Sequence, residues 1–448
     1  MGRCASAGRI RENPDSSPAA QDSRSSGLVS SGHDGVRRGQ RSSCRHEAAI
    51  AMQSCRHVPD TPRGNMRIQI RAAVLSMALL STAACSHLSA QGADPAKDER
   101  IQPAASGNER AARHAAFEDA LRAAGIPGAQ LVHLRHGEGE TYLHGVLNAD
   151  TGARVTEQTT FQAASLSKVV AAYITLRFAA AGKIDLDAPL WNYWHSPRTK
   201  DNALARGITA RMVLNHTTGL PNWQISPSNP AIDGTPLESS FAPGTRFAYS
   251  GEGFYLLQRT LEHIAGSSWD ALAEQEVFSR FDMPSSSFLT KHASDPRNAS
   301  GHEQDGTPRA ERVFAWENTA WTLVTTARDY ANFIQRALYK GEGLEPATRS
   351  MMFSPSSNAD NASSPNPADP FIAWGLGVGL QDADGRRLAW HWGDNPGFKA
   401  FFALDPSTGE SLVLFTNSEN GPATYKQVLR LFMGDGSYPA LDWINGQE

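Results

Sequence analysis

A serine and a lysine stand three residues apart, Ser165 and Lys168, directly before an apolar run that is typical of a buried helix. The run covers residues 169–176. Positions i and i+3 of a helix share a face, so we expect the two side chains to meet. A serine hydroxyl is a weak nucleophile until a base takes its proton, and a desolvated lysine can be that base because burial disfavours its charged form. The start of the helix adds N–H groups and a positive dipole that would stabilise an oxyanion.

A plainer interpretation of this pattern exists. Ser-x-x-Lys is expected about once by chance in a chain of this length, and Ser165 could cap a helix while Lys168 stays in water. A second segment favours the first interpretation. It carries Tyr249 between a turn pattern at 243–245 and a helical pattern at 252–264. A tyrosine on such a turn can face a cleft, and near a lysine its phenolate is a competent general base.

A third segment, His391-Trp392-Gly393, ends the apolar strand pattern of residues 387–390 and precedes a turn pattern at 394–397. A strand edge beside a serine offers backbone N–H groups to an oxyanion. The three segments in this order resemble the motifs of the penicillin-recognising serine hydrolases, specifically the class C β-lactamase-like and D-alanyl-D-alanine carboxypeptidase-like group. That group has Ser-x-x-Lys, then Tyr-x-Asn, then Lys-Thr-Gly or His-x-Gly.

Two shorter segments add to the resemblance, which covers residues 108–434. Residues 214–220 resemble the family segment between the first two motifs, and residues 394–398 resemble the turn after the third. The resemblance implies an α+β (mixed α/β) fold of the β-lactamase/transpeptidase type.

The resemblance also implies a role for each motif residue. Ser165 would attack a carbonyl, while Lys168 and Tyr249 share the proton transfers. The backbone N–H groups of Ser165 and Asp394 would form the oxyanion hole. An acyl-serine would form and be released by water. This chemistry needs no metal and no organic cofactor.

Three departures from the family pattern bear on the substrate. The family asparagine, which holds a substrate amide, is Gly251 here and has no side chain. The family lysine, a fixed cation for a substrate carboxylate, is His391, so we expect a weaker and pH-dependent contact. Trp392 replaces a small hydroxyl residue before Gly393 and would crowd the strand edge. These four positions are the predicted substrate-binding residues, and they disfavour β-lactams and D-Ala-D-Ala peptides.

Composition limits the other classes of function. The chain has 448 residues, is 40% hydrophobic and 20% charged, and carries a net charge of −4, with no basic cluster of the kind that binds nucleic acid. Its 14 histidines show no metal-ligand spacing, and it lacks the Gly-x-Ser-x-Gly elbow of α/β-hydrolases. All four cysteines lie in the first 85 residues, which excludes disulfides and thiolate metal sites from the rest. They are Cys4, Cys44, Cys55 and Cys85.

The N-terminal part reads as a sequence of processing segments. Residues 1–65 are rich in Arg, Ser and Gly and cannot bury a core, so they are either a disordered extension or an over-extended translation start. Residues 66–85 have the positive start, short apolar middle and small residues of a signal peptide. They end at Cys85 in a sequence that resembles a bacterial lipoprotein cleavage box. Residues 86–107 would tether the domain.

Hydrophobic patterning outlines one catalytic domain over residues 108–434 and a tail at 435–448. A helix at 108–124 and two strands at 129–135 and 141–147 open it. The middle is mostly helical with long loops, including a helix at 327–338. Strands return near the C-terminus and a final helix closes the domain; these elements are predicted at 373–380, 387–391, 399–403, 412–417 and 422–433. Strands from both chain ends flanking a helical middle predict an antiparallel sheet covered by helices.

Other residues near the motifs invite interpretation. We expect His216 to form structural hydrogen bonds rather than to catalyse, and Glu252 to be an acid at a helix start. Trp223, Trp316 and Trp392 fall in loops or beside motifs, where they either line an apolar pocket or belong to the core.

Together these features predict an exported serine hydrolase, held to the membrane through a lipid on Cys85. Its partner would be a small-molecule or peptide-like ester or amide, with an esterase-like preference. The alternatives are a D-Ala-D-Ala carboxypeptidase or β-lactamase of the same family and, in another class, a non-catalytic binding lipoprotein that retains the fold.

Overall fold

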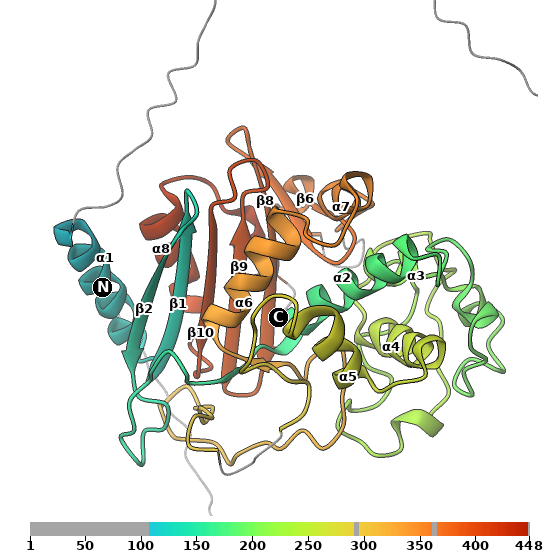
Figure 1. The fold of residues 1–448 in the computed structure, drawn as a ribbon, viewed down its shortest axis with the longest axis horizontal. Coiled ribbons are helices and arrows are strands. Elements are labelled where there is room, and N and C mark those ends of the chain that lie inside the picture. Colours follow the sequence, from blue (N-terminus) through green and yellow to red (C-terminus); the bar gives the residue numbers. More distant parts are fainter. Residues whose placement is uncertain (1–106, 291–294, 361–364, 447–448) are drawn as a thin grey trace, which may run out of the picture. The chain divides into compact units, whose positions relative to one another are not determined.

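An eight-stranded antiparallel sheet, in the order β2-β1-β10-β9-β8-β7-β6-β5, is the centre of the computed structural model (Figure 1). The structure describes residues 107–290, 295–360 and 365–446. The first two strands and the last six come from opposite ends of this part of the chain, as the sequence predicts. Their bounds are β1 Gly128–Arg135, β2 Glu138–Gly145, β5 Ser357–Asn358, β6 Ile372–Trp374, β7 Gly379–Ala383, β8 Arg386–Asn395, β9 Phe398–Leu404 and β10 Ser411–Thr416.

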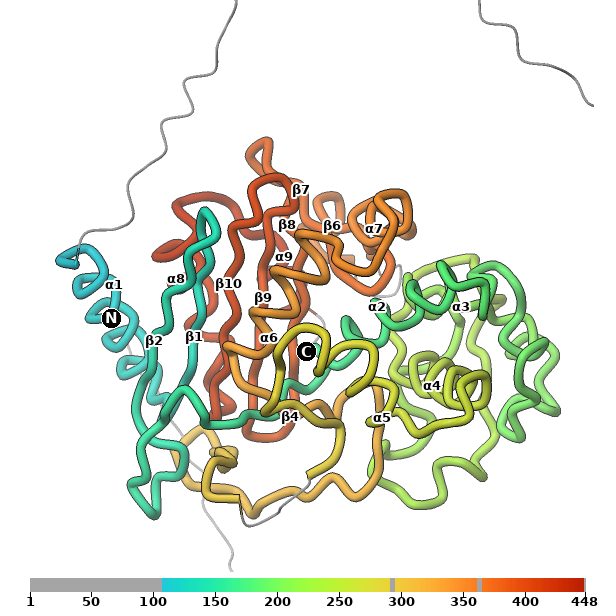
Figure 2. The backbone as a smooth tube through the Cα atoms, viewed as in Figure 1, coloured from blue at the N-terminus to red at the C-terminus, as the bar shows by residue number. Residues whose placement is uncertain are grey.

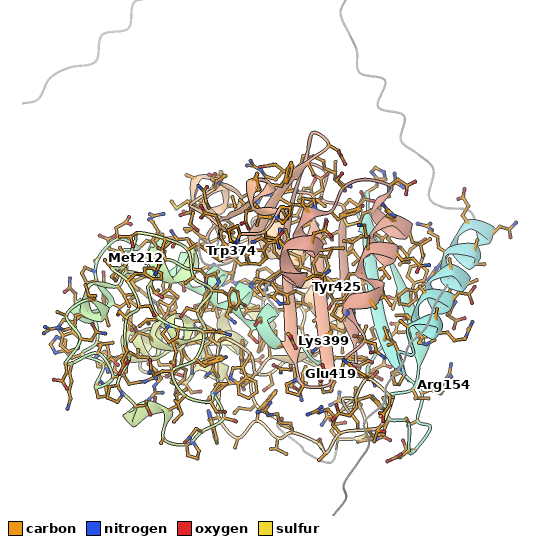
Figure 3. All side chains as sticks on the ribbon, turned by 180° about the vertical axis from the view of Figure 1, so that it is seen from behind. Arg154, Met212, Trp374, Lys399, Glu419 and Tyr425 are labelled. Atoms are coloured by element: carbon orange, nitrogen blue, oxygen red, sulfur yellow. The ribbon has the colours of Figure 1, made fainter. Side chains whose placement is uncertain are left out.

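Both faces of the sheet are covered, because every residue of β9 and β10 is buried. Side chains alternate between the faces, so Phe402 joins one apolar cluster and Phe401 the other. Three helices cover one face: α1 (Gly107–Ala123), α8 (Pro422–Met433) and α9 (Pro439–Asn445). Figure 3 views that face, where Tyr425 of α8 donates to the carbonyl of Ala400 in β9. The opposite face carries α6 (Ala327–Phe333) and α2 (Ser167–Ala180).

A mostly helical region follows α2 in the chain and lies beside the sheet (Figure 2). It holds α3 (Ala210–Leu214), α4 (Gly251–Ala265) and α5 (Trp269–Ala273). Helix α4 begins where the Ser250 hydroxyl accepts the N–H of Gly253, and it ends at Gly266, whose φ of 68° suits glycine. Three shorter elements complete the fold: β3 Phe161–Gln162, β4 Val324–Thr325 and α7 Pro346–Phe353.

Two expectations about the C-terminal part were wrong. The strand predicted at 373–380 is two strands, β6 and β7, separated by a turn in which Gly377 has a φ of 89°. The expected tail instead contains α9, whose Trp443 is fully buried. This helix is too short for its period to stand out in the sequence, and tertiary burial of its apolar residues holds it in place.

The expectations for residues 1–65, 66–85, with Cys85, and 86–106 lie outside the described residues. Among the residues that the structure describes, no helix is both long and apolar enough to cross a membrane.

Candidate active site

The nucleophile candidate lies on a tight turn that leads into α2. A short 3-10 turn, Ala164–Leu166, precedes the helix, and Ala164 has a φ of 48°. A left-handed alanine costs about 1 to 3 kcal/mol, so the surrounding contacts must hold it. Ser167 provides two of these contacts: its hydroxyl donates to the Ala164 carbonyl at 2.5 Å and accepts the N–H of Leu323 at 3.0 Å. The second serine of the motif therefore fixes the turn that presents Ser165.

Lys168 is placed as a base for Ser165. Its Nζ lies 3.0 Å from the Ser165 hydroxyl and 2.8 Å from the carbonyl oxygen of Ala320. The side chain is buried, and burial lowers the pKa of Lys168 well below its ordinary value. An amine with a lowered pKa is uncharged at a lower pH and can accept the serine proton. The shared helix face expected from the sequence is present.

Tyr249 comes from the turn before α4 and faces the same two residues. Its ring centroid lies 4.8 Å from Lys168 Nζ, so the amine stands over the ring face. Burial raises the pKa of the Tyr249 hydroxyl, and the nearby Ser165 lowers it by less. The hydroxyl is buried and makes no hydrogen bond of good geometry with any described residue. Lys168 is thus a base within hydrogen-bond distance of Ser165, and Tyr249 is a neutral phenol beside it.

His216 packs against Tyr249 from behind. The two rings stack with centroids 4.3 Å apart, and His216 Nδ1 accepts the N–H of Ser250 at 3.1 Å. Burial and the nearby Lys168 hold the pKa of His216 well below its ordinary value. The expected structural hydrogen bond of His216 is confirmed.

His391 differs from its expected place at the substrate side. The ring is fully buried, and its Nδ1 donates to the carbonyl of Trp392 at 2.7 Å. Burial, with a smaller effect of Lys168, lowers the pKa of His391 to about 3. Trp392 lines the cavity and His391 does not, although the two rings stack with their centroids 5.2 Å apart. The expectation of a partly charged, pH-dependent carboxylate contact at His391 was wrong.

Gly393 and Asp394 bring strand β8 against the nucleophile turn. A Cβ on Gly393 would stand 2.4 Å from the carbonyl oxygen of Ala163, so only glycine permits this approach. The carboxylate of Asp394 forms an ion pair with Lys399, which also pairs with Glu419 at 2.5 Å (Figure 3). Ser165 and Asp394 line one cavity, as an oxyanion hole made of their N–H groups requires.

That cavity has a volume of about 620 Å³, and both aromatic and polar side chains line it. Of the two interpretations left open for these tryptophans, the pocket applies to Trp223 and Trp392, whereas Trp316 does not line this cavity. Gly251 lies beneath Trp223 and Gly393 beside the Ala163 carbonyl, so neither lines it either. The aromatic side chains that do are Trp223, Phe247, Tyr249, Trp321 and Trp392.

Three further lining residues, Asn222, Arg312 and Trp321, were missed by sequence reasoning. Asn222 lies two residues after the end of the 214–220 segment, which was a usable signal. Its side-chain oxygen accepts the N–H of Gly251 at 2.9 Å. Arg312 and Trp321 come from the long connection before β4, where no motif marks them. Within the described residues, no group of three or more His, Cys, Asp or Glu side chains could hold a metal ion.

The fold and the cavity together define a β-lactamase/transpeptidase-like protein. The sequence model of the Beta-lactamase family matches residues 114–431, and the chain belongs to this family. The relatives include penicillin-binding protein 4 of Amycolatopsis lactamdurans, 24% identical over 336 residues that cover 71% of this chain and 88% of the relative. Esterase EstB of Burkholderia gladioli is 28% identical over 224 residues, which cover 44% of this chain and 56% of the esterase.

Solved structures show the same fold. The crystal structure of SurE aligns with a TM-score of 0.63 at 24% identity over 74% of this chain and 78% of that one. The D-amino acid amidase of Ochrobactrum anthropi aligns with a TM-score of 0.61 at 22% identity, over 76% and 98%. A class C β-lactamase aligns with a TM-score of 0.61 at 17% identity, over 74% of this chain and 98% of that one. The predicted family and fold class are confirmed, and the family is one of serine hydrolases.

Proposed function

We propose that this protein is a serine hydrolase that cleaves esters or amides through an acyl-serine on Ser165. One observation carries the proposal: the buried Lys168 amine, with its lowered pKa, lies 3.0 Å from the Ser165 hydroxyl. A lysine left in water would be charged and could not accept the serine proton. This geometry disfavours the helix-cap interpretation and also the non-catalytic binding lipoprotein, which would not need a desolvated base.

The proposed reaction has two halves. Lys168 takes the Ser165 proton as the hydroxyl oxygen attacks the carbonyl carbon, and the N–H groups of Ser165 and Asp394 stabilise the oxyanion. Tyr249, a neutral phenol within the cluster, donates a proton to the leaving group and regains it from Lys168. The bond to the leaving group breaks and an acyl-serine remains. In the second half Lys168 and Tyr249 take a proton from water as its oxygen attacks the acyl carbon. The bond from that carbon to the Ser165 oxygen breaks, Ser165 regains a proton from these groups, and the acid leaves.

We propose simple esters as the preferred substrates. The family's amide-binding asparagine is replaced by the buried Gly251, and its cation by the neutral His391. Both replacements remove polar contacts that a D-Ala-D-Ala peptide or a β-lactam would use. The alternatives are D-peptide cleavage and β-lactam hydrolysis. The solved structures with this fold include a D-alanine carboxypeptidase and a class C β-lactamase.

We also propose export, with residues 66–84 as the signal and a lipid on Cys85. The support is the sequence pattern. Stable anchoring takes more than one acyl chain, which a lipidated cysteine would supply. Mass spectrometry of the membrane-extracted protein tests this proposal. A mature N-terminus before Met66, or an unmodified Cys85, would overturn it.

Labelling with a fluorophosphonate probe tests the catalytic proposal directly. We expect covalent modification at Ser165, none in Ser165→Ala, and full modification in the control Ser350→Ala, which changes an exposed serine of α7. Hydrolysis of 4-nitrophenyl acetate should be lost with the label. Labelling and turnover that persist in Ser165→Ala would overturn the assignment.

A further inference from the structure

The Ser165 cavity contains one uncompensated charge. Its charged lining residues are Lys168, Asp394 and Arg312. Burial disfavours the charged form of Lys168, and Asp394 is paired with Lys399. Arg312 forms no ion pair with a described carboxylate. An arginine is always protonated in proteins, so this charge is permanent.

Arg312 is held in place by an aromatic ring instead of by an acid. Its guanidinium carbon lies 4.7 Å from the ring centroid of Trp321, which also lines the Ser165 cavity. Stacking of this kind orients the flat guanidinium and leaves its N–H groups available at the edges. The side chain is half-buried, so it is only partly solvated.

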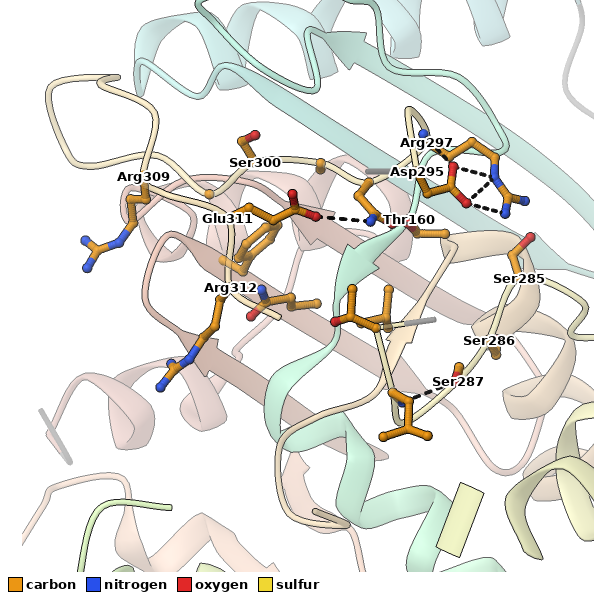
Figure 4. A pocket seen from close by; sticks show the side chains of 18 of the residues that line it. Thr160, Ser285, Ser286, Ser287, Asp295, Arg297, Ser300, Arg309, Glu311 and Arg312 are labelled. Carbon is orange, nitrogen blue, oxygen red and sulfur yellow. Dashed lines mark hydrogen bonds and ion pairs between the residues drawn. The ribbon is translucent and has the colours of Figure 1, made fainter. Parts of the chain in front are cut away.

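Arg312 also stands where two cavities meet. A second cavity of about 600 Å³ adjoins the first, and both are lined by Arg312 and Pro396. Figure 4 shows the second cavity, with Arg312 among its lining residues. Hydroxyl and amide side chains are among the residues that line the second cavity, including Ser285, Ser287 and Asn298. Arg312 therefore borders both cavities.

The other charged groups near Arg312 already have partners. Arg309 pairs with Glu303 at 2.5 Å and with Glu419 at 3.7 Å. Glu311, the chain neighbour of Arg312, accepts a hydrogen bond from Asn298 at 3.3 Å.

The remaining acid and base of the second cavity neutralise each other. Asp295 and Arg297 form an ion pair of 2.6 Å (Figure 4). Arg312 is therefore the lining guanidinium, among the described residues, that a carboxylate ligand would find unpaired.

We propose that Arg312 binds a carboxylate of the substrate, at the edge of the Ser165 cavity that opens toward the second cavity. The proposal rests on the hydrolase function proposed above and narrows its substrates to esters or amides that carry a carboxylate away from the scissile bond. A guanidinium matches a carboxylate with two parallel hydrogen bonds. Arg312 would thus bind the carboxylate that the neutral His391 is unable to bind, although it lies in another loop.

Two matched pairs of esters test the proposal. The acyl-side pair is the mono-4-nitrophenyl ester of adipic acid and 4-nitrophenyl 6-oxoheptanoate, which replaces the carboxylate by a methyl ketone. The leaving-group pair is 5-acetoxy-2-nitrobenzoic acid and its methyl ester. We expect the wild type to favour the carboxylate by about tenfold or more in kcat/KM in at least one pair. The preference should be equal at about pH 6 and about pH 9, because arginine does not titrate there.

Variants separate Arg312 from its surroundings. Arg312→Gln should bring the ratio of the two kcat/KM values within a pair to about one, and Arg312→Lys should keep part of the preference. The control Arg309→Gln removes a neighbouring guanidinium that is already ion-paired, and it should keep the full preference. Absence of a preference in the wild type, or its survival in Arg312→Gln, would overturn the proposal.

A binding measurement keeps the test independent of catalysis. Monomethyl adipate is titrated by calorimetry into Ser165→Ala and into Ser165→Ala combined with Arg312→Gln. We expect about tenfold weaker binding in the double variant. Equal binding, or no binding to either, would overturn the role of Arg312. Failure of the hydrolase function would be seen separately, as absence of fluorophosphonate labelling in the wild type.

Discussion

The indole of Trp223 lies over Gly251 so closely that a Cβ at position 251 would stand 2.5 Å from the ring. The position where the family pattern has an amide side chain is therefore occupied by an aromatic ring from another loop. Asn222, the residue before Trp223, also contacts Gly251, because its Oδ1 accepts the Gly251 N–H. Gly251 and Trp223 therefore depend on each other, because the ring of Trp223 leaves no room for a side chain at position 251.

Restoring the family asparagine should fail while Trp223 is present. We expect Gly251→Asn to lower the free energy of unfolding by about 1 to 3 kcal/mol, because it overpacks a buried site, and to reduce ester hydrolysis. Adding Trp223→Ala should recover part of both losses and raise the ratio of nitrocefin to ester turnover. Denaturant unfolding and steady-state kinetics measure these effects. Additive losses in the double variant would show that the two positions are independent.

Lys168 links activity to stability. Burial lowers its pKa well below the usual 10.5. At pH values between the pKa of Lys168 in the native state and its pKa in the unfolded chain, the unfolded chain binds a proton that the native state lacks. Stability therefore rises with pH in this window, by up to about 1.4 kcal/mol per pH unit from this group. We expect Lys168→Met to abolish ester hydrolysis, raise the free energy of unfolding at neutral pH and flatten its pH slope.

Denaturant unfolding at several pH values checks the Lys168 prediction. The control is Lys200→Met, since 66% of the Lys200 side chain is exposed. It should change neither the stability nor the slope by a measurable amount. A Lys168→Met variant with a wild-type slope would show that the native lysine stays charged, and the proposed base would lose its support.

The motifs predicted the centre of the site because they are local. Ser165 and Lys168 meet because they are three residues apart across the turn that leads into α2, and Tyr249 follows from a turn before a well-capped helix. Arg312 and Trp321 could not be predicted in the same way. They lie in a long connection with no helix or strand period, and only tertiary packing brings them to Ser165.

The error at His391 has a related cause. The motif correctly predicted the strand, but it does not say which of two neighbouring side chains lines the cavity. Tertiary packing decides this: Trp392 lines the cavity and His391 is fully buried. Burial then changes the chemistry of the imidazole, because a ring without solvent stays neutral.

A buried ion pair fixes the loop that carries Trp223. Arg198 and Glu252 are both buried, with hydrogen bonds of 2.6 and 3.1 Å, and Glu252 also accepts the N–H of Gln224 at 2.9 Å. Glu252 is at the start of a helix as expected, but it also ties that helix to the loop. We expect Glu252→Gln to cost about 3 kcal/mol of stability, because it leaves Arg198 unneutralised.

Glu252→Gln should also displace the loop that carries Trp223. We therefore expect this variant to raise KM for esters by a larger factor than it lowers kcat. The control Asp187→Asn removes a comparable arginine pair, with Arg211, whose acid is 64% exposed. It should cost less than about 1 kcal/mol and leave KM unchanged. Equal effects of the two variants would remove the special role of the buried pair.

Hydrolysis of β-lactams should be weak compared with ester hydrolysis. A cephalosporin presents an amide that the family binds with the asparagine missing at Gly251, and a carboxylate that it binds with the cation missing at His391. Each lost polar contact costs about 1 to 3 kcal/mol in transition-state binding. Arg312 is positioned to meet a carboxylate on another side of the cavity, so it does not restore the arrangement that the ring system requires.

The ratio of the two activities should also be independent of pH. His391 has a pKa of about 3, so it is neutral throughout the working range, and no carboxylate contact is lost as the pH rises. We expect kcat/KM for nitrocefin to stay far below that for a 4-nitrophenyl ester, with the same ratio at about pH 6 and about pH 8. A ratio that falls across this interval would mean that His391 titrates near neutrality, and therefore that water reaches it in the working enzyme. Efficient nitrocefin turnover at both values would mean instead that Asn222 and Arg312 supply the missing contacts, and the ester preference would then be wrong.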